Sequence, residues 1–377
     1  MNFELNEEQS ALQDSLARVL GDRYGFEQRR ALVASGQAHD AGTWRAFAEL
    51  GITALPLPQA YGGFGGGARD LLPLMQALGR VLSLEPYLSS VVLAATAVRL
   101  AADEDLQGKL LPAVASGESV LAWAHDEPAG RHAPLWVDTR ATHGNGRWVL
   151  SGGKGPVLGL GLARQIVVSA RVAGAAGEPE GCALFLVDAG APGVDVRTFR
   201  LVDDSAAGEL QLRDAAAVPL HDPRDSARAR CAIEGTLTAG IAAACADMSG
   251  AMQATFDLTM DYLRTRMQFG RFIGENQALR HRAADMLVSL EMARSMAIGA
   301  AVAADDPAGE DSARDLLRAK LSVGRHAREL AHGAIQLHGG IGMTEEYAVG
   351  HYLRRIHVLD QLFGDSDAQA ARLAALA

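Results

Sequence analysis

Hydrophobic positions recur at helical spacing in two separate stretches of the chain, residues 1–118 and 223–377. In the first stretch, Leu12, Leu16 and Leu20 fall on one face of a predicted helix, and further helices are predicted over 71–84, 87–100 and 103–117. In the second stretch, residues 225–269 contain no proline and predict one very long helix. Three more helices are predicted over 279–305, 311–337 and 347–362, and long helices joined by short turns favour a bundle.

Between these stretches the hydrophobic period changes. Short apolar runs separated by Gly, Pro, Asp and Asn follow one another, namely VLAWAH, RWVLSG, RQIVVSAR, CALFLVD and VDVRTF. Such runs are typical of strands and turns, and they predict an antiparallel sheet or barrel. We therefore expect an α+β protein with an N-terminal helical domain (1–118), a central β-barrel or β-sandwich domain (119–222) and a C-terminal four-helix bundle (223–377).

Charge and cysteine content exclude several classes of function. The 377 residues carry a formal charge of −10, which argues against a general nucleic-acid binder, although a local basic patch stays open. Three widely spaced cysteines without a CxxC or Cys/His cluster indicate neither a zinc site nor a disulfide framework. An acidic start and the lack of an apolar run near about 18–20 residues predict a cytoplasmic protein with no membrane span.

The glycine-rich stretch YGGFGGGARD has the composition of a phosphate cradle. Gly63, Gly65 and Ala68 match the dinucleotide pattern G-x-G-x-x-A, but that pattern must follow a strand, and the preceding residues TWRAFAELGI predict a helix. A flexible loop is the better interpretation.

Two further segments stand out. The first ends the long predicted helix with Arg264, Arg266 and Arg271 beside a Phe-Gly pair. It is interpreted either as a helix end, where arginines complement the helix dipole, or as a diphosphate site, because Arg binds phosphate oxygens in bidentate fashion. The second, His338-Gly339-Gly340, is either a helix cap or a place where a cofactor passes close to bare backbone.

Taken together, these segments resemble the acyl-CoA dehydrogenase family over essentially the whole chain. The motifs F-x-L-x-E-E-Q, R-x-x-F-G-x-x-I-x-x-x-Q and Q-x-H-G-G-x-G occur in family order. Within the family, DRYGFEQRR, YGGFGGG, LEPYL, QLHGGIGMTEEYAVGHYLRR and LFGD make the chain similar to small subunits of pimeloyl-CoA dehydrogenases. The resemblance implies FAD held between subunits, and hence a homodimer or tetramer, or a heterotetramer with a catalytic dehydrogenase subunit.

Positions that match the family's motifs imply the cofactor contacts. Arg266 and Phe269 would contact the FAD of a neighbouring subunit, with Gln277 nearby. Gln336, Gly339 and Gly340 would line the diphosphate and adenosine portion. In the middle domain, the family's flavin contacts correspond to His125, Asp126 and Leu158, the last in place of a threonine that supports the flavin.

The family's chemistry removes the α-proton of an acyl-CoA thioester, and the β-hydrogen leaves as hydride to the flavin, which gives a trans-2-enoyl-CoA. The resemblance implies that one donor to the thioester carbonyl is the backbone N–H of Phe363. The usual base is the Glu of an E-G-T sequence, but this chain reads Phe363-Gly364-Asp365. An alternative position for the Glu, on the long helix, holds Gly240 beside Ile241, so both standard base positions lack a carboxylate.

Asp365 is the carboxylate nearest in sequence to the missing base. It is interpreted either as a replacement base or as the cap of a final helix that begins with Ser366-Asp367.

Three functions stay open. The chain is a FAD-dependent acyl-CoA dehydrogenase of fatty acid or dicarboxylate degradation, which passes electrons to an electron-transfer flavoprotein. Alternatively, it is a subunit without a base that completes a partner's FAD site. A flavin-dependent monooxygenase on the same fold is a third possibility, which rests on His125.

Overall fold

The structure, a computed structural model, describes residues 7–178 and 180–376. The chain divides into two compact units. The helical unit comprises Met1–Arg30, Ala68–Ser83 and Ile241–Ala377, and the β unit comprises Ala31–Gly67 and Leu84–Gly240. The N-terminal helices are therefore shared between the two units.

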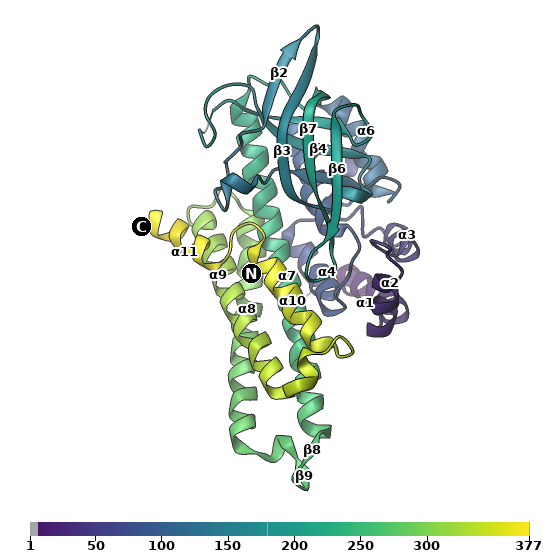
Figure 1. Cartoon of the computed structure of the whole chain (residues 1–377), viewed down its shortest axis with the longest axis vertical. Helices are drawn as coiled ribbons and strands as arrows, with labels where there is room; N and C mark the ends of the chain where they lie inside the picture. Colours follow the sequence, from purple (N-terminus) through teal and green to yellow (C-terminus); the bar gives the residue numbers. More distant parts are fainter. Residues whose placement is uncertain (1–6, 179, 377) are drawn as a thin grey trace. The chain divides into compact units, whose positions relative to one another are not determined.

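The helical unit is built on long helices that the sequence predicted to within a few residues (Figure 1). Two helices are divided between the units: the helical unit contains α2 (Phe26–Ala34) as far as Arg30 and α7 (Ser226–Thr265) from Ile241 onward. Its other elements are α1 (Glu7–Arg23), α4 (Ala68–Arg80), β8 (Met267–Gln268), β9 (Arg271–Phe272), η5 (Ile273–Glu275), α8 (Gln277–Asp305), α9 (Ser312–His338), η6 (Gly339–Met343), α10 (Ala348–Gln361) and α11 (Ser366–Ala375).

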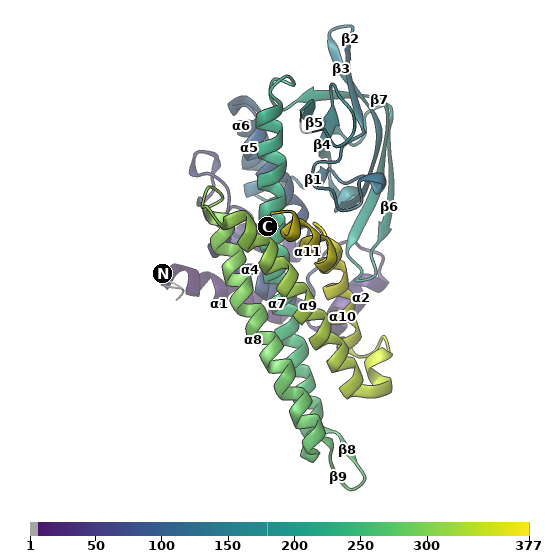
Figure 2. The same cartoon turned by 90° about the vertical axis from the view of Figure 1, so that its left-hand side faces the viewer.

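Helices α8 and α9 lie side by side along much of their length (Figures 1 and 2). Small buried side chains permit the close approach: Ala293, Ala297 and Ala300 on α8 are buried, as are Ala327 and Ala331 on α9. Helices α10 and α11 pack against α9. The core of the C-terminal bundle is thus rich in alanine, in keeping with the low content of aromatic residues in the chain.

The sequence predicts no segment with the length and hydropathy of a membrane span, but helix α8 has both. Among the described residues, α8 has a window of mean hydropathy 1.4, which is apolar enough to cross a membrane. Within the structure, 44% of that window is buried. This is weak support for a span, because the core helix of a helical bundle meets the same criteria, and α8 packs on α9 and α4.

In its described part, residues 31–67, 84–178 and 180–240, the β unit combines short helices with seven strands. The helical elements are α3 (Ala41–Glu49), η1 (Gln59–Tyr61), the π-helical η2 (Tyr87–Ala94), α5 (Ala95–Ala101), α6 (Glu104–Ala115), η3 (Pro128–Gly130), η4 (Leu160–Leu162) and the first part of α7. The strands are β1 (Leu121–Ala124), β2 (Arg140–Gly144), β3 (Arg147–Leu158), β4 (Gln165–Arg171), β5 (Cys182–Asp188), β6 (Val194–Arg200) and β7 (Ala206–Pro219).

The sheet closes on itself. Strand pairs run β4-β2-β3-β7-β5 and return from β5 to β4, so these five strands form a ring, while β1 is added to β4 and β6 to β7. The predicted barrel is confirmed, but the predicted antiparallel pairing is only partly correct, because β1 and β2 both run parallel to β4. A parallel pairing requires a distant partner, and local hydrophobic alternation does not report one.

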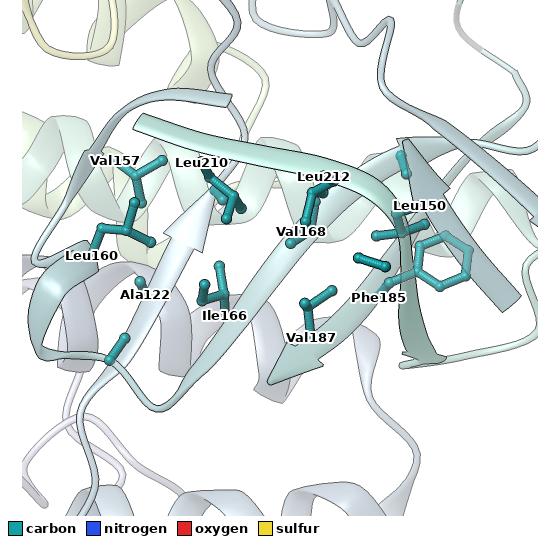
Figure 3. Packing of buried hydrophobic residues seen from close by; sticks show 14 of the residues in the cluster. Ala122, Leu150, Val157, Leu160, Ile166, Val168, Phe185, Val187, Leu210 and Leu212 are labelled. Carbon is teal, nitrogen blue, oxygen red and sulfur yellow. The ribbon is translucent and has the colours of Figure 1, made fainter. Parts of the chain in front are cut away.

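The core of the β unit lies inside this ring (Figure 3). Alternate residues of β4 point inward, among them Ile166 and Val168, and they meet Phe185 of β5 and Leu210 of β7. The long strand β3 adds Leu150 and Val157 to the same cluster, so its buried side chains fix the strand that also carries Lys154.

Candidate functional site

The loop between α10 and α11 holds the position where the family's base is expected. Phe363 has φ +62° and Gly364 has φ +93°, so two successive residues lie in the left-handed region. A bulky residue with a positive φ is uncommon and costs about 1–3 kcal/mol, so the surroundings must enforce it. Two buried side chains do so.

Gln369 of α11 and Lys320 of α9 hold the backbone carbonyls of this loop. The Gln369 Nε2 donates to the Phe363 and Gly364 carbonyls at 2.8 and 3.0 Å. The Lys320 Nζ donates to the Asp360 carbonyl at 2.7 Å and to the Gly364 carbonyl at 3.3 Å. Lys320 and Gln369 are both 0% exposed. Sequence reasoning singled out neither residue.

A buried carboxylate lies next to this clamp. Asp360 is 1% exposed; its Oδ1 accepts from the Ser366 hydroxyl at 3.1 Å and lies 4.0 Å from the Lys320 Nζ, and its Oδ2 lies 3.5 Å from the Arg328 Nε. Burial lowers the pKa of Lys320, while the thiol of Cys245 and the carboxylate of Asp360 oppose that shift. The Asp360 carboxylate thus faces cations in the interior of the unit.

Asp365 caps the last helix. Its Oδ1 accepts from the Ala368 N–H at 2.9 Å, and its backbone is extended, with φ −74° and ψ 178°. The predicted cap is confirmed. A carboxylate in this role satisfies an otherwise unpaired helix N–H. The alternative base position is apolar, since Ile241 is buried on α7. Farther along α7, the buried Asp247 is paired with Arg355 of α10, with Nε and Oδ1 3.2 Å apart.

The hairpin that follows α7 carries two of the expected FAD contacts. Strands β8 and β9 pair Met267 with Phe272, and the Ile273 N–H donates to the Arg266 carbonyl at 2.9 Å. Phe269, with φ +52°, forms the tip and is 100% exposed. The long helix ends four residues before its predicted end because this hairpin begins at Arg266. Gln277 is the exposed first residue of α8.

The end of α9 carries three more of the expected FAD contacts. Gln336, Gly339 and Gly340 are all exposed, and a Cβ at either glycine would meet no atom within 4 Å. Gly339 has φ +66° and ends the helix. Because these two glycines have no Cβ and their backbone is exposed, a cofactor could lie close to the chain here.

An aromatic cluster brings the end of α7 to the end of α9. The Tyr262 ring stacks on His338 with centroids 4.5 Å apart, and the Tyr262 hydroxyl donates to the His338 carbonyl at 3.3 Å. Tyr347 covers His338 from a third element, at 5.1 Å between centroids. Burial lowers the pKa of His338, so this ring is neutral at pH 7. The structure therefore brings the segments of Arg266 and of Gln336 to Gly340 together within one unit.

In the β unit, the side chain of His125 is buried and engaged. Its Nε2 lies 2.8 Å from the Pro134 carbonyl, which only accepts, so Nε2 carries the proton. Its Nδ1 then accepts from the Ser169 hydroxyl at 2.9 Å. Burial lowers the pKa of His125, and Lys154 adds to the effect. The ring is therefore buried with both nitrogens engaged, so the structure adds no support to the monooxygenase alternative that rested on His125.

Lys154 organises this network. Its Nζ donates to the His125 carbonyl at 3.0 Å, to Ser169 Oγ at 2.9 Å and to Glu127 Oε1 at 2.7 Å. Glu127 in turn accepts from the N–H groups of Asp138 and Thr139 at 2.9 and 3.0 Å. Burial raises the pKa of Glu127, but Lys154 and these hydrogen bonds outweigh it and lower the pKa overall.

The other two expected flavin contacts of the β unit lie at its surface or near it. Asp126 is exposed, and its carbonyl accepts from the Gly155 N–H at 2.8 Å. Leu158 is half-buried at the end of β3. Lys154 thus fixes the backbone beside both His125 and Asp126. The sequence pattern of strand β3 gives no sign of this role, because a lysine in a strand is usually exposed.

The glycine-rich loop is not a phosphate cradle. The N–H groups of Gly63, Phe64, Gly65 and Gly66 donate to backbone carbonyls of residues 54–58 at 2.8–3.2 Å. The amides that would bind an anion are therefore engaged, and the loop is tied down rather than free. Gly63 is required by packing, since a Cβ there would lie 2.0 Å from the Leu57 carbonyl oxygen.

Models of one protein family match two separate parts of the chain. The family model "Acyl-CoA dehydrogenase, N-terminal domain" matches residues 6–118, and "Acyl-CoA dehydrogenase, C-terminal domain" matches residues 231–377. Among curated relatives, acyl-CoA dehydrogenase FadE27 of Mycobacterium tuberculosis is 29% identical over 92% of this chain and 91% of its own length. The probable acyl-CoA dehydrogenase YngJ of Bacillus subtilis is 26% identical over 98% and 97%.

Solved structures agree with these relatives. A variant of the Tcur3481-Tcur3483 steroid ACAD is 29% identical with a TM-score of 0.87, covering 98% of this chain and 97% of that chain. The ChsE4-ChsE5 complex of Mycobacterium tuberculosis is 26% identical with a TM-score of 0.87, covering 100% and 98%. The matched domains, the curated relatives and the shared fold lead to one conclusion: this chain belongs to the acyl-CoA dehydrogenase family of oxidoreductases.

Proposed function

We propose that this chain is a subunit of a FAD-dependent acyl-CoA dehydrogenase, that it helps to form a FAD site, and that it lacks its own proton-abstracting residue. A catalytic partner of the same family performs the α,β-dehydrogenation of the acyl-CoA in this assembly. Electrons pass from there to an electron-transfer flavoprotein.

The state of the carboxylates near Phe363 carries this proposal. A base must reach the proton that it removes, and Phe363 supplies no basic group. Asp365 is engaged as a helix cap, and Asp360 is buried among Lys320, Arg328 and Ser366. The alternative position on α7 holds the buried Ile241. Within the described part of the helical unit, every carboxylate close to this loop in sequence thus has a structural role, except the exposed Asp367.

The residues present fit FAD as the cofactor. The open backbone at Gly339 and Gly340 suits a diphosphate, Arg266 supplies a guanidinium, and the fully exposed Phe269 supplies an aromatic face for a neighbouring subunit. FAD, when bound, supplies the hydride acceptor. Fold neighbours include PigA with FAD and proline, and a glutaryl-CoA dehydrogenase of Mycobacterium smegmatis in complex with FADH2.

A two-protein assembly is supported by the relatives. ChsE4-ChsE5 is a complex of two differently named proteins, and the Tcur3481-Tcur3483 steroid ACAD is likewise named for two. A hetero-oligomer of this kind explains how one chain keeps the cofactor-binding surface without a base. A self-sufficient homodimer or tetramer with Asp365 as the base is the competing version.

Anaerobic titration of the purified chain with a panel of acyl-CoAs tests the proposal. We expect a flavin that is not bleached by any thioester when the chain is alone, and bleaching when a partner with a Glu-Gly-Thr sequence is added. Bleaching by the chain alone would overturn the proposal. In that case, loss of bleaching in Asp365→Asn would identify Asp365 as the base, and retained bleaching would exclude it.

A further inference from the structure

The side chain of His351, on α10, joins three parts of the helical unit. It is 4% exposed, and its ring packs edge-on against Phe26 of α2, with centroids 4.9 Å apart. Its Nε2 lies 3.1 Å from the carbonyl of Glu345, in the turn of residues 344–347 that follows η6. The ring therefore ties α2 and α10 to the segment that carries Gly339 and Gly340.

The hydrogen bonds of His351 assign its proton. A carbonyl only accepts, so the Nε2 that faces the Glu345 carbonyl carries the hydrogen. The Nδ1 then has a lone pair, and two arginines approach it: the Arg354 Nη2 lies at 2.8 Å and the Arg29 Nη1 at 3.5 Å. A guanidinium only donates, so neither contact survives a proton on Nδ1. The surroundings therefore fit the neutral form of the ring alone.

The charges around this ring come from all three parts. Helix α10 supplies Arg354, α2 supplies Arg29, and the turn supplies the Glu345 carboxylate, whose Oε2 lies 3.4 Å from the His351 Nε2. Arg30 of α2 also interacts with that carboxylate. Burial lowers the pKa of His351, and the guanidinium groups of Arg354 and Arg29 lower it further, while Glu345 opposes the shift.

Arg354 links the ring to the turn a second time. Its two terminal nitrogens bind the Glu345 carboxylate at 3.0 and 2.9 Å, and the Nη2 that binds Oε2 is also the one that donates to His351. A proton on Nδ1 therefore displaces the nitrogen that holds Glu345. The Glu345 side chain is 68% exposed, and an exposed ion pair alone contributes little to stability. The buried histidine thus determines whether the turn stays closed.

We propose that His351 is a positioning residue for the segment Gly339–Met343, and that it holds this segment only while its ring is neutral. A proton from solvent on Nδ1 turns Arg354 away and opens the turn at Glu345. Tyr347 of the same turn packs on His338, at the start of η6, so the opening reaches the segment directly. The inference rests on the proposed function for the identity of the cofactor, FAD, which the chain then retains less well as the pH falls.

Hydrogen exchange of the purified full-length chain tests the inference. Exchange of peptides that cover residues 339–347 is followed from about pH 8 to pH 5 and corrected for the intrinsic pH dependence of amide exchange. The opened turn has the ordinary histidine pKa of about 6.5, and the closed turn has a lower one, so opening should increase by up to about tenfold for each pH unit below 6.5. In His351→Gln we expect no such rise, because glutamine does not titrate.

His357→Gln is the matched control. His357 lies on the same helix, and burial likewise lowers its pKa, but it lies outside the turn, so the wild-type rise should persist. His338 is a second buried histidine next to the segment, and the rise should persist in His338→Gln as well. Should His351→Gln not fold, Arg354→Gln gives a second readout. It removes one cation that opposes the charged ring, so the rise should be smaller and should level off at a higher pH.

The outcomes separate this inference from the proposed function. No rise in the wild type, or an equal rise in His351→Gln, overturns the role of His351, whether or not the chain lacks a base. Flavin-loaded wild type should also release FAD faster at about pH 5.5 than at about pH 7.5, and His351→Gln should not. Equal release by both proteins would overturn the link to the cofactor. Bleaching of the flavin by an acyl-CoA in the chain alone overturns the proposed function, and the exchange experiment still decides the role of His351.

Discussion

Two buried lysines, one in each unit, hold backbone next to the expected cofactor and substrate contacts, but they do so differently. Lys154 of the β unit is paired with Glu127 at 2.7 Å, and each group that it touches has a further partner. Lys320 of the helical unit has carbonyl partners, and its nearest carboxylate oxygen, on Asp360, is 4.0 Å away.

The difference separates a closed network from an open one. In the β unit, the protons of Lys154, Ser169 and His125 are all assigned by their neighbours, so no group there is available to a ligand. In the helical unit, Lys320 and Gln369 satisfy backbone carbonyls, and among the described residues the N–H groups of Phe363 and Gly364 donate no hydrogen bond. The first arrangement gives a loop its shape, and the second presents donors.

The largest expected effect tests the open loop. Phe363→Glu places a carboxylate on a backbone that Lys320 and Gln369 already hold. General base catalysis contributes about 10²–10⁴-fold, so we expect flavin reduction by acyl-CoA to rise by about that factor over the wild-type background. Stopped-flow absorbance of the flavin under anaerobic conditions measures it. An equally placed but unreactive Phe363→Gln variant is the control, and reduction at the same rate in both variants would contradict the prediction.

The next effect compares the two lysines directly. Lys154→Met leaves the buried Glu127 carboxylate without its cation, which costs about 3–5 kcal/mol of unfolding free energy. Lys320→Met removes hydrogen bonds to carbonyls and a cation 4.0 Å from the Asp360 carboxylate. Because Asp360 keeps Arg328 and Ser366 as neighbours, we expect a smaller loss of about 1–3 kcal/mol. Urea denaturation measures both.

The double variant Lys154→Met, Glu127→Gln is the control for the ion pair. Removing both charges should recover part of the loss, because no uncompensated carboxylate then remains buried. Equal losses for Lys154→Met and Lys320→Met would show that the ion pair is not what distinguishes the two units.

A pH series gives a smaller effect. The pKa of His125 is lowered, first by burial, so the unfolded chain binds more protons than the folded chain below about pH 6.5. Stability should therefore fall as the pH drops from 6.5, and fall further below about 4.5, where Glu127, with its lowered pKa, takes up a proton on unfolding. In His125→Gln the first decline should weaken. Thermal midpoints between about pH 3.5 and 8 measure both declines, and an unchanged slope in His125→Gln would refute the assignment of the first decline to His125.

The smallest effect on stability is expected at the exposed hairpin. Phe269→Ala removes a side chain that is fully exposed in this chain, so unfolding should change by less than about 0.5 kcal/mol. Retention of flavin by the oligomer should nevertheless decrease, because the proposed function places Phe269 against the FAD of a neighbouring subunit. Gel filtration with absorbance at the flavin band checks this, and Phe269→Trp should keep the flavin. A large loss of stability would place Phe269 in the core of the chain instead.

Sequence patterns predicted the elements well and the networks poorly. The long helices were predicted because their apolar spacing is uninterrupted by proline, and the end of α7 was misplaced only because a hairpin replaces its last turn. Asp365 was recognised as a cap because capping is local. The clamp was missed because Lys320 lies 40 residues from Asp360 and 44 from Gly364. No local signal marks a lysine on a helix as buried, and parallel pairing of β1 and β2 with β4 is equally non-local.

The left-handed backbone at Phe363 has a consequence for how such chains diverge. Because neighbouring helices impose the conformation through carbonyl contacts, the identity of the side chain at this position is nearly independent of the shape of the loop. After a gene duplication, one copy of such a chain can lose the reaction through a single codon change while it keeps its fold and its surfaces for assembly. The same codon is then the shortest route by which activity returns.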